Sequence, residues 1–278
     1  MEFFDENLPK NGDTVVVGLS GGVDSTLTAL LLQKKGCKVI GVTMSLWDGR
    51  VPENLGDKVL KPSCYSPSEV TNIEECAKFC KENNIEYHVV DVKKEYNDCV
   101  LEYFKAEYRS GRTPNPCIQC NRIVKFGALL EEIKKLNIEY DYFCTGHYAK
   151  IVRPAEGLWG TDVRPCMISS AIDQSKDQTY FLCMINQRQL RKSLFPIGHL
   201  TKPEVRAIAN EYNLATAAKK DSTGICFIGE RNFRQFLMSY FQNPIPLRSY
   251  DIIEFENLKN IIINSLNSVF NNLKNENI

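Results

Sequence analysis

A glycine-rich loop between a strand and a helix is the feature of the sequence that most constrains its fold. An apolar run at residues 15–19 predicts a buried strand, and leucines three and four positions apart predict a helix over 25–35. The adjacent glycines Gly21 and Gly22 lie in the loop between them, and residues 39–47 predict a second strand. A strand, a helix and a strand in this order predict a parallel sheet covered by helices.

The same alternation continues along the chain. We expect further strands at 87–92 and 142–144, and further helices at 73–83, 95–108 and 123–136. The predicted fold class is therefore α/β, with a doubly wound parallel sheet. A later helical pattern at 202–212, with a proline near its start, predicts a small, mainly helical appendage.

Pattern and composition divide the chain into three parts. We predict an α/β domain at 1–190, a partial central domain at 191–245 and an Asn- and Ile-rich tail at 246–278. Apolar residues recur every four positions in this tail, which is typical of an amphipathic helix.

The charges of the chain cancel as a whole but not locally. The 278 residues include 34 basic and 34 acidic side chains, which excludes a uniformly basic nucleic-acid-binding protein. Residues 51–107 have 7 basic and 12 acidic side chains, whereas residues 186–236 have 9 and 4. The second stretch is either a basic face for an anionic partner or simply a solvated surface.

The sequence also bears on location. No apolar run reaches the roughly 18–20 residues that span a bilayer, and the acidic N-terminus lacks the pattern of a signal peptide. We therefore expect a cytoplasmic protein with no membrane partner.

The glycine-rich loop has the groups that phosphate binding requires. Its backbone N–H groups can form an anion-binding nest, and the helix that follows adds a partial positive charge. Asp24 can cap this helix or hold Mg²⁺ against bound phosphates. A tight turn with no ligand is the alternative interpretation. The predicted phosphate-binding residues are Gly18, Leu19, Ser20, Gly21, Gly22, Val23, Asp24 and Ser25.

The string from Ser20 to Ser25, Ser-Gly-Gly-Val-Asp-Ser, resembles the signature of the PP-loop ATP pyrophosphatases. This resemblance implies cleavage of ATP between its α- and β-phosphates and adenylation of a substrate oxygen. It does not choose among the members of the superfamily.

Two cysteine motifs add a second chemistry. Cys117 and Cys120 form a C-x-x-C motif that we expect just before a helix beginning near Arg122, where the helix N-terminus and nearby cations favour thiolates. Cys226 lies in a short run, bracketed by Gly224 and Gly229, that is predicted to be strand-like. Taken separately, each motif also fits cysteines with no role in chemistry.

Taken together, the motifs resemble those of the tRNA-specific 2-thiouridylase family. The likeness runs from about residue 14 to about residue 240, with every motif in order. It rests on Thr113-Pro114-Asn115-Pro116 with Cys120-Asn121, on Thr145-Gly146-His147-Tyr148, on Lys176-Asp177-Gln178 with Tyr180-Phe181-Leu182, and on residues 221–229.

This resemblance implies an ATP-dependent transfer of sulfur to C2 of the wobble uridine, position 34, of tRNA. ATP would be bound by residues 18–25 together with Met44 and Gly146. The target base would lie against Asn115, Pro116 and Cys117, and tRNA would contact Lys176, Asp177 and Gln178.

The resemblance also implies the two catalytic residues. Cys226 would carry a persulfide received from a cysteine desulfurase or a sulfur-relay protein, and Cys120 would form a disulfide with it. Sulfur anions are strong nucleophiles near neutral pH, and thiol–disulfide exchange can release the transferred sulfur.

Two departures from the family leave alternatives open. Some members have Asp at the position of Cys117, so Cys117, Cys120 and Cys226 could instead be ligands of a four-iron, four-sulfur cluster. The likeness also fades after about residue 240, and the family's two C-terminal β-rich domains are not found. The alternatives are thus an impaired homologue that binds only ATP or tRNA, and another PP-loop ligase.

Overall fold

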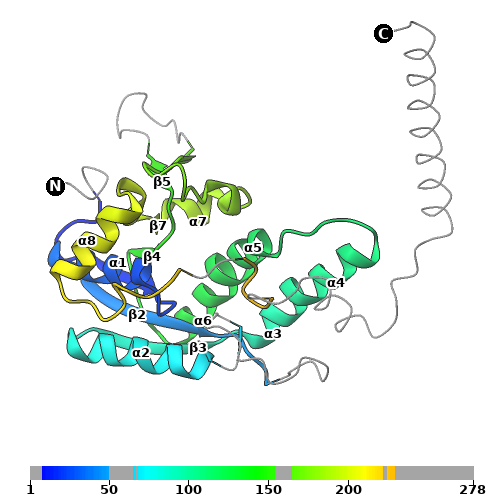
Figure 1. Cartoon of the computed structure of the whole chain (residues 1–278), viewed down its shortest axis with the longest axis horizontal. Helices are drawn as coiled ribbons and strands as arrows, with labels where there is room; N and C mark the ends of the chain where they lie inside the picture. The colour runs from blue at the N-terminus through cyan, green and yellow to red at the C-terminus, as the bar shows by residue number, and fades with distance from the viewer. Residues whose placement is uncertain (1–7, 50–64, 67, 154–164, 222–223, 229–278) are drawn as a thin grey trace, which may run out of the picture.

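A computed structural model describes residues 8–49, 65–66, 68–153, 165–221 and 224–228. Its centre is a five-stranded sheet in the order β3-β2-β1-β4-β7, and every pairing in it is parallel (Figure 1). The strands are β1 Thr14–Gly18, β2 Lys38–Ser45, β3 Glu86–Asp91, β4 Tyr142–Thr145 and β7 Ser193–Leu194. The predicted parallel sheet is confirmed.

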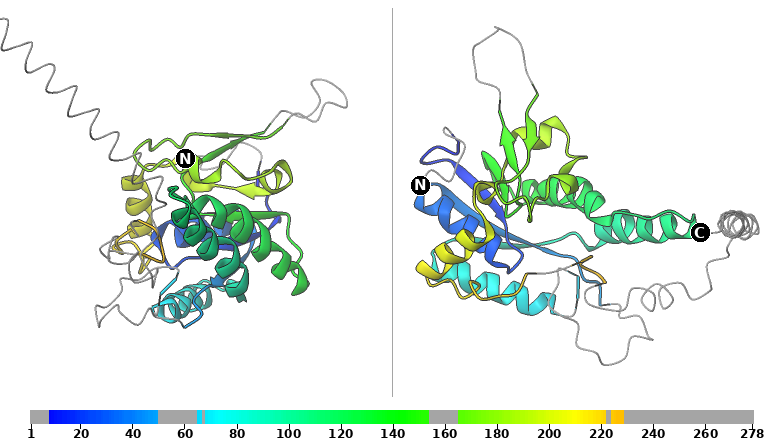
Figure 2. Two further views of the ribbon diagram at one scale, coloured as in Figure 1. Left: turned by 90° about the vertical axis from the view of Figure 1, so that its right-hand side faces the viewer. Right: turned by 45° about the horizontal axis from the view of Figure 1, so that its top comes forward.

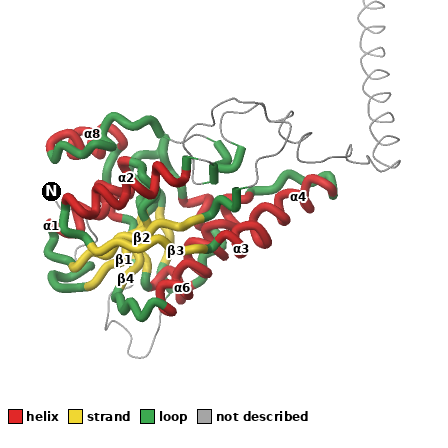
Figure 3. The backbone as a smooth tube through the Cα atoms, turned by 90° about the horizontal axis from the view of Figure 1, so that it is seen from below, coloured by secondary structure: helices red, strands yellow, loops and turns green. Residues whose placement is uncertain are grey.

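Helices cover both faces of this sheet. Side chains alternate along β1, so that Val15 and Val17 lie in one apolar core and Val16 in the other. Figure 3 shows the strands between the two helical layers. The first layer contains α1 Val23–Lys34, α2 Glu69–Glu82 and α8 Lys202–Glu211, and the second contains α3 Lys93–Tyr96, α4 Glu102–Arg109, α5 Pro116–Gln119 and α6 Leu129–Lys135.

Two π-helical segments interrupt the second layer. One covers Asn97–Leu101 between α3 and α4, and the other covers Cys120–Ala128 between α5 and α6. Such segments recur at functional sites because the wider turn shifts the side chains that follow it. Hydrophobic spacing did not reveal either of them.

The helix after the C-x-x-C motif begins earlier than predicted. Pro116 is its first residue, and the Asn115 side chain accepts a hydrogen bond from the Ile118 N–H at 3.2 Å. This cap and the preset backbone of proline start the helix before the cysteines. The expectation of a start near Arg122 was therefore wrong, and Cys117 and Cys120 lie within the helical segment.

The strand predicted around Cys226 is also wrong. Residues 226–228 form a turn, in which the Ile228 N–H donates to the Ile225 carbonyl at 2.9 Å. Adjacent side chains of a strand point to opposite faces, so only one of two neighbours is buried in a half-exposed edge strand. Phe227 and Ile228 are adjacent and both buried.

Short elements complete the described fold. An antiparallel hairpin that the sequence did not reveal, β5 Lys150–Val152 and β6 Met167–Ser169, stands away from the sheet (Figure 2). The remaining elements are α7 Gln187–Arg191 and the 3₁₀ turns Thr179–Leu182 and Pro196–His199. No described helix has both the length and the apolar character for a membrane span.

The three-part division of the chain stays a prediction. β7 and α8, which follow residue 190, pack in the sheet and against α1 as parts of one core. The predicted tail and its amphipathic helix lie outside the described residues.

Candidate functional site

The glycine-rich loop connects β1 to α1 at the carboxyl edge of the sheet. Gly21 has a φ of +73°, a left-handed conformation that favours glycine, and a Cβ there would lie 3.3 Å from the Asn72 side-chain oxygen. The Ser25 hydroxyl accepts a hydrogen bond from the Ser20 N–H at 3.2 Å and donates to the Gly22 carbonyl at 3.1 Å. The loop is therefore preformed.

The predicted adenosine contacts lie at the same edge. β1 is flanked by β2, which carries Met44, and by β4, which precedes Gly146. Because the chain order reverses between these strands, their carboxyl ends form the crevice where α/β sheets bind ligands. A Cβ at Gly146 would lie 2.9 Å from the Ser25 backbone nitrogen, so the two loops touch.

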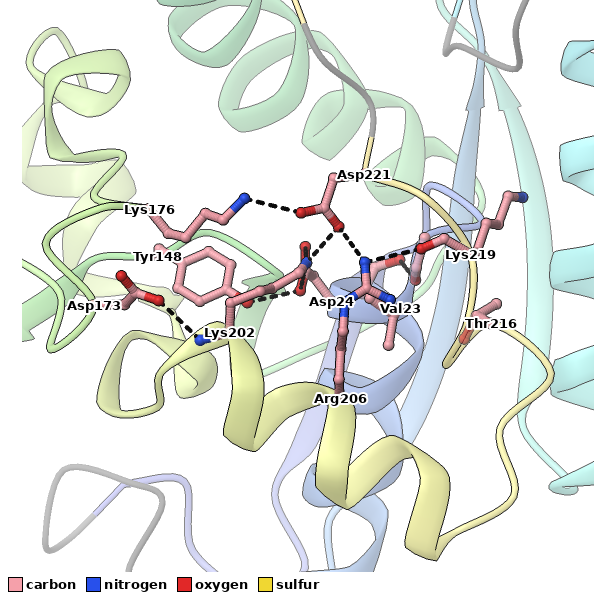
Figure 4. Close-up of polar contacts among 12 residues, drawn as sticks. Val23, Asp24, Tyr148, Asp173, Lys176, Lys202, Arg206, Thr216, Lys219 and Asp221 are labelled. Atoms are coloured by element: carbon pink, nitrogen blue, oxygen red, sulfur yellow. Dashed lines mark hydrogen bonds and ion pairs between the residues drawn. The ribbon is translucent and has the colours of Figure 1, made fainter.

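Asp24 has two partners that the sequence did not suggest. Lys202 Nζ lies 2.8 Å and 2.9 Å from its carboxylate oxygens, and the Tyr148 hydroxyl donates to Oδ1 at 2.9 Å (Figure 4). Burial, followed by the nearby Asp24 charge, raises the pKa of Tyr148, so this phenol stays protonated. Lys202 is the first residue of α8, whose start is fixed by a capping box between Thr201 and Glu204.

Lys202 belongs to a larger charged cluster over the loop, which we call the Asp221 cluster: Asp24, Lys176, Lys202, Arg206 and Asp221. Asp221 lies 2.7 Å from Lys202 Nζ, 3.0 Å from Lys176 Nζ and 3.0 Å from Arg206. Burial alone would raise the pKa of Asp221, but hydrogen bonds from Lys202 and Lys176 outweigh it and lower that pKa. Three cations face two carboxylates, and this excess of positive charge favours an anionic ligand.

The three predicted tRNA contacts have different surroundings. Lys176 belongs to the Asp221 cluster. Asp177 accepts hydrogen bonds from the Ala171 and Thr179 N–H groups, and Gln178 accepts one from the Tyr148 N–H. Asp177 and Gln178 thus shape the loop in which they lie, and contact of all three residues with tRNA stays a prediction.

The cysteines predicted to handle sulfur lie on the other face of the sheet. Cys120 is buried in the second core, and Cys226 packs against the same core. The hydroxyl of the fully buried Tyr96 lies 3.0 Å from Cys226 Sγ, and Phe227 packs edge-on against Phe104 at 4.9 Å between ring centroids.

The residues predicted to lie against the target base surround the start of α5. Pro116 is buried, whereas Asn115 and Cys117 are half-buried. Close by, the buried Asn121 amide donates to the Phe181 carbonyl at 3.1 Å, which ties the second π-helical segment to residues 179–182.

The geometry does not form an iron–sulfur ligand set. Within the described ranges, no three or more His, Cys, Asp or Glu side chains are grouped to hold a metal ion. Cys117, Cys120 and Cys226 all belong to these ranges, so the three residues do not fit a four-iron cluster in this arrangement.

Two buried cysteines, Cys37 and Cys80, are chemically quiet. Burial raises the pKa of Cys37 to about 11 and that of Cys80 to about 12. Thiols with such values are almost entirely protonated at neutral pH and react slowly.

Comparison with known proteins identifies the family of the chain. The family model described as "tRNA methyl transferase HUP domain" matches residues 13–230. The tRNA-specific 2-thiouridylase MnmA of Lacticaseibacillus paracasei is 50% identical over 86% of this chain and 59% of its own length. That of Streptococcus thermophilus is 49% identical over 81% of this chain and 55% of its own length.

Structural likeness is weaker. The U34-tRNA thiolase NcsA from Methanococcus maripaludis, solved with its [4Fe-4S] cluster, is similar with a TM-score of 0.48 and 19% identity, covering 92% of this chain and 75% of its own. The chain spans less than two thirds of the curated relatives it matches, but the family model covers most of it. The chain therefore belongs to the tRNA methyl transferase HUP domain family, and its curated relatives are tRNA-specific 2-thiouridylases.

Proposed function

We propose that the chain catalyses ATP-dependent 2-thiolation of uridine 34 in tRNA. The observation that carries this proposal is the coexistence of a preformed phosphate loop with Cys120 and Cys226 on one apolar core. Identities of 49–50% to 2-thiouridylases support it. An amide-forming ligase of the same superfamily would have no use for these thiols.

The first half of the reaction uses the edge of the sheet. The backbone N–H groups of residues 18–25 bind the phosphates, while Met44 and Gly146 contact the adenosine. Mg²⁺ neutralises phosphate charge in such sites, and the Asp24 carboxylate would hold it in exchange for its contacts with Lys202 and Tyr148. The uridine C2 oxygen attacks the α-phosphate and pyrophosphate leaves, so that a poor leaving group becomes AMP.

The second half moves the sulfur. The outer sulfur of a Cys226 persulfide attacks C2, and AMP leaves with the former C2 oxygen. The Cys120 thiolate then attacks Cys226 Sγ, which forms the Cys120–Cys226 disulfide and releases the 2-thiouridine sulfur. A dithiol reductant must supply two electrons before the next turnover.

The partners follow from this scheme. Asn115, Pro116 and Cys117 lie against the target base, and Lys176, Asp177 and Gln178 contact tRNA. A cysteine desulfurase or a sulfur-relay protein supplies the persulfide. We expect this reaction to take place in the cytoplasm. Because the three cysteines do not form a metal-binding group, no step of the scheme uses an iron–sulfur cluster.

A second candidate is a homologue that binds ATP or tRNA without completing thiolation. The phosphate loop of residues 18–25, preformed by the Ser20, Gly22 and Ser25 hydrogen bonds, would alone suffice for this candidate. Both candidates require the phosphate loop, but only the first requires the two cysteines.

The test compares Cys226→Ser and Cys120→Ser with the exposed Cys183→Ser as control. Pyrophosphate release should persist in all three, whereas mass spectrometry of the tRNA should find 2-thiouridine only with the parent and Cys183→Ser. Full thiolation by Cys226→Ser would exclude the persulfide scheme. Pyrophosphate release without thiolation by the parent would favour the second candidate.

A further inference from the structure

Asp221 connects three parts of the molecule that the proposed reaction uses in sequence. Its carboxylate contacts Lys202, which also binds Asp24 of the phosphate loop, and it contacts Lys176 of the predicted tRNA motif. Along the chain it precedes the sulfur-carrying Cys226 by five positions. Five residues reach at most about 18 Å, so a fixed Asp221 restricts where Cys226 can lie.

The segment 214–221, which leads to Cys226, is fastened to the nucleotide-binding face at other points as well. The hydroxyls of Thr216 and Thr26 lie 2.7 Å apart, and Lys219 Nζ lies 2.6 Å from Glu75 of α2. Arg206 donates to the backbone carbonyls of Ala217 and Lys219. Asp221 differs from Glu75 because its partner, the Lys202 ammonium group, is shared with Asp24 of the phosphate loop (Figure 4).

Lys202 is the centre of this arrangement. Its side chain is only 9% exposed, and its ammonium group lies between the carboxylates of Asp24 and Asp221. The Lys202 N–H also donates to Asp173, which fixes the start of α8. Two carboxylates already neutralise this buried ammonium group, so a further anion can pair with Lys202 only by displacing one of them.

We propose that Asp221 is a positioning residue that holds the segment leading to Cys226 against the nucleotide site, and that ATP phosphates compete with it for Lys202. The inference rests on the proposed function, because it takes residues 18–25 as the ATP site and Cys226 as the sulfur carrier. Phosphates that bind beside Asp24 would give Lys202 and Lys176 a partner more highly charged than Asp221. The ion pairs of Asp221 would then hold the segment less tightly.

The competition works in both directions. If ATP weakens the hold of Asp221 on the segment, then Asp221 weakens the binding of ATP by the same factor. Removing the Asp221 charge should therefore tighten ATP binding and free Cys226 at once. A residue that only stabilised the fold would not tighten ATP binding when it was replaced.

The experiment uses Asp221→Asn, which keeps the shape and removes the charge. Glu75→Gln is the matched control, because it also removes an ion pair of this segment but has no contact with Lys202 in the described structure. Calorimetry measures the Kd for MgATP. Peptide mass spectrometry measures the rate at which iodoacetamide alkylates Cys226, with the buried Cys120 and Cys166 as internal references for general loosening.

We expect Asp221→Asn to bind MgATP about 3–10-fold more tightly than the parent. Iodoacetamide should alkylate its Cys226 about 3–10-fold faster, while the alkylation rates of Cys120 and Cys166 stay unchanged. MgATP should accelerate alkylation of Cys226 in the parent and in Glu75→Gln but not in Asp221→Asn. ATP binding that is unchanged or weaker in Asp221→Asn, or an unchanged Cys226 rate, would overturn the inference. If the parent fails to bind ATP, the proposed function is wrong, and the Cys226 rates without ATP alone decide whether Asp221 anchors the segment.

Discussion

Gly146 lies so close to Ser25 that a Cβ on the glycine would come within 2.9 Å of the serine backbone nitrogen. The same Cβ would also lie 2.9 Å from the Asp24 carbonyl carbon. At Gly22, by contrast, a Cβ would meet only the Ser20 hydroxyl, at 3.6 Å. The loop after β4 is therefore fitted to the phosphate loop at Gly146, whereas a Cβ at Gly22 would make only an ordinary van der Waals contact.

Gly146→Ala should separate these two loops. Because the obstructing atoms are backbone atoms, we expect the free energy of unfolding to fall by about 1–3 kcal/mol and ATP binding to weaken. Denaturant unfolding and calorimetry measure the two effects. Parent-like stability would show that the contact yields without cost.

Gly22→Ala is the complementary change. Its fold should be retained, because the added methyl group has room, but that methyl group would fill space that a bound phosphate needs. We expect parent-like thermal unfolding together with loss of pyrophosphate release. Normal release would mean that phosphates do not approach Gly22.

Tyr96→Phe tests the contact with Cys226. The variant keeps the aromatic ring, which stacks on Tyr65 at 5.3 Å, and removes only the hydroxyl. We expect a loss of about 0.5–1.5 kcal/mol in stability and a lower rate of sulfur transfer with unchanged pyrophosphate release. Tyr65→Phe, which loses a hydroxyl that donates to Asp48, is the control and should transfer sulfur at the parent rate.

His147 should make the fold sensitive to mild acid. Burial, aided by Lys125, holds the pKa of His147 well below its usual value, and its Nδ1 lies 2.6 Å from the Thr145 hydroxyl. Below about pH 6.5 the unfolded chain gains a proton that the folded chain does not, so the unfolding free energy falls by up to about 1.4 kcal/mol per pH unit. This loss continues until the pH reaches the lowered pKa of the folded state.

Urea unfolding at pH 7.5, 6.0 and 5.0 measures this slope. A His147→Asn variant should show a shallower slope, because it lacks this imidazole and keeps the other two histidines of the chain. Equal slopes would assign the pH dependence to other groups.

Iron should not be retained in stoichiometric amounts. After anaerobic reconstitution with iron and sulfide, we expect far fewer than the four irons per chain of a cluster and no broad absorption near ~400 nm. Four irons per chain, lost on replacing any one of Cys117, Cys120 and Cys226, would contradict the observed arrangement and the persulfide route.

The sequence predicted the parts of the site that depend on local patterns. The loop around Gly21 and Gly22, its strand and its helix follow from short-range periodicity, whereas Gly146 was proposed only because of the family resemblance. The ion pair of Asp24 and Lys202 joins residues 178 positions apart, and no local pattern encodes such a contact. The turn at Cys226 was missed because burial of adjacent apolar residues depends on Phe104 and its core, not on spacing.

The same separation along the chain affects how the protein is made on the ribosome. Asp24 is synthesised early, but Lys202, its ammonium partner, follows 178 residues later, after β4 and with the edge strand β7. At about 5–20 residues per second, this interval lasts roughly 10–35 s. Until Lys202 has been synthesised, the Asp24 carboxylate of the phosphate loop lacks the cation that neutralises its charge. Competence to bind nucleotide should thus arrive late in translation, and an mRNA truncated before codon 202 should yield a loop that lacks this partner.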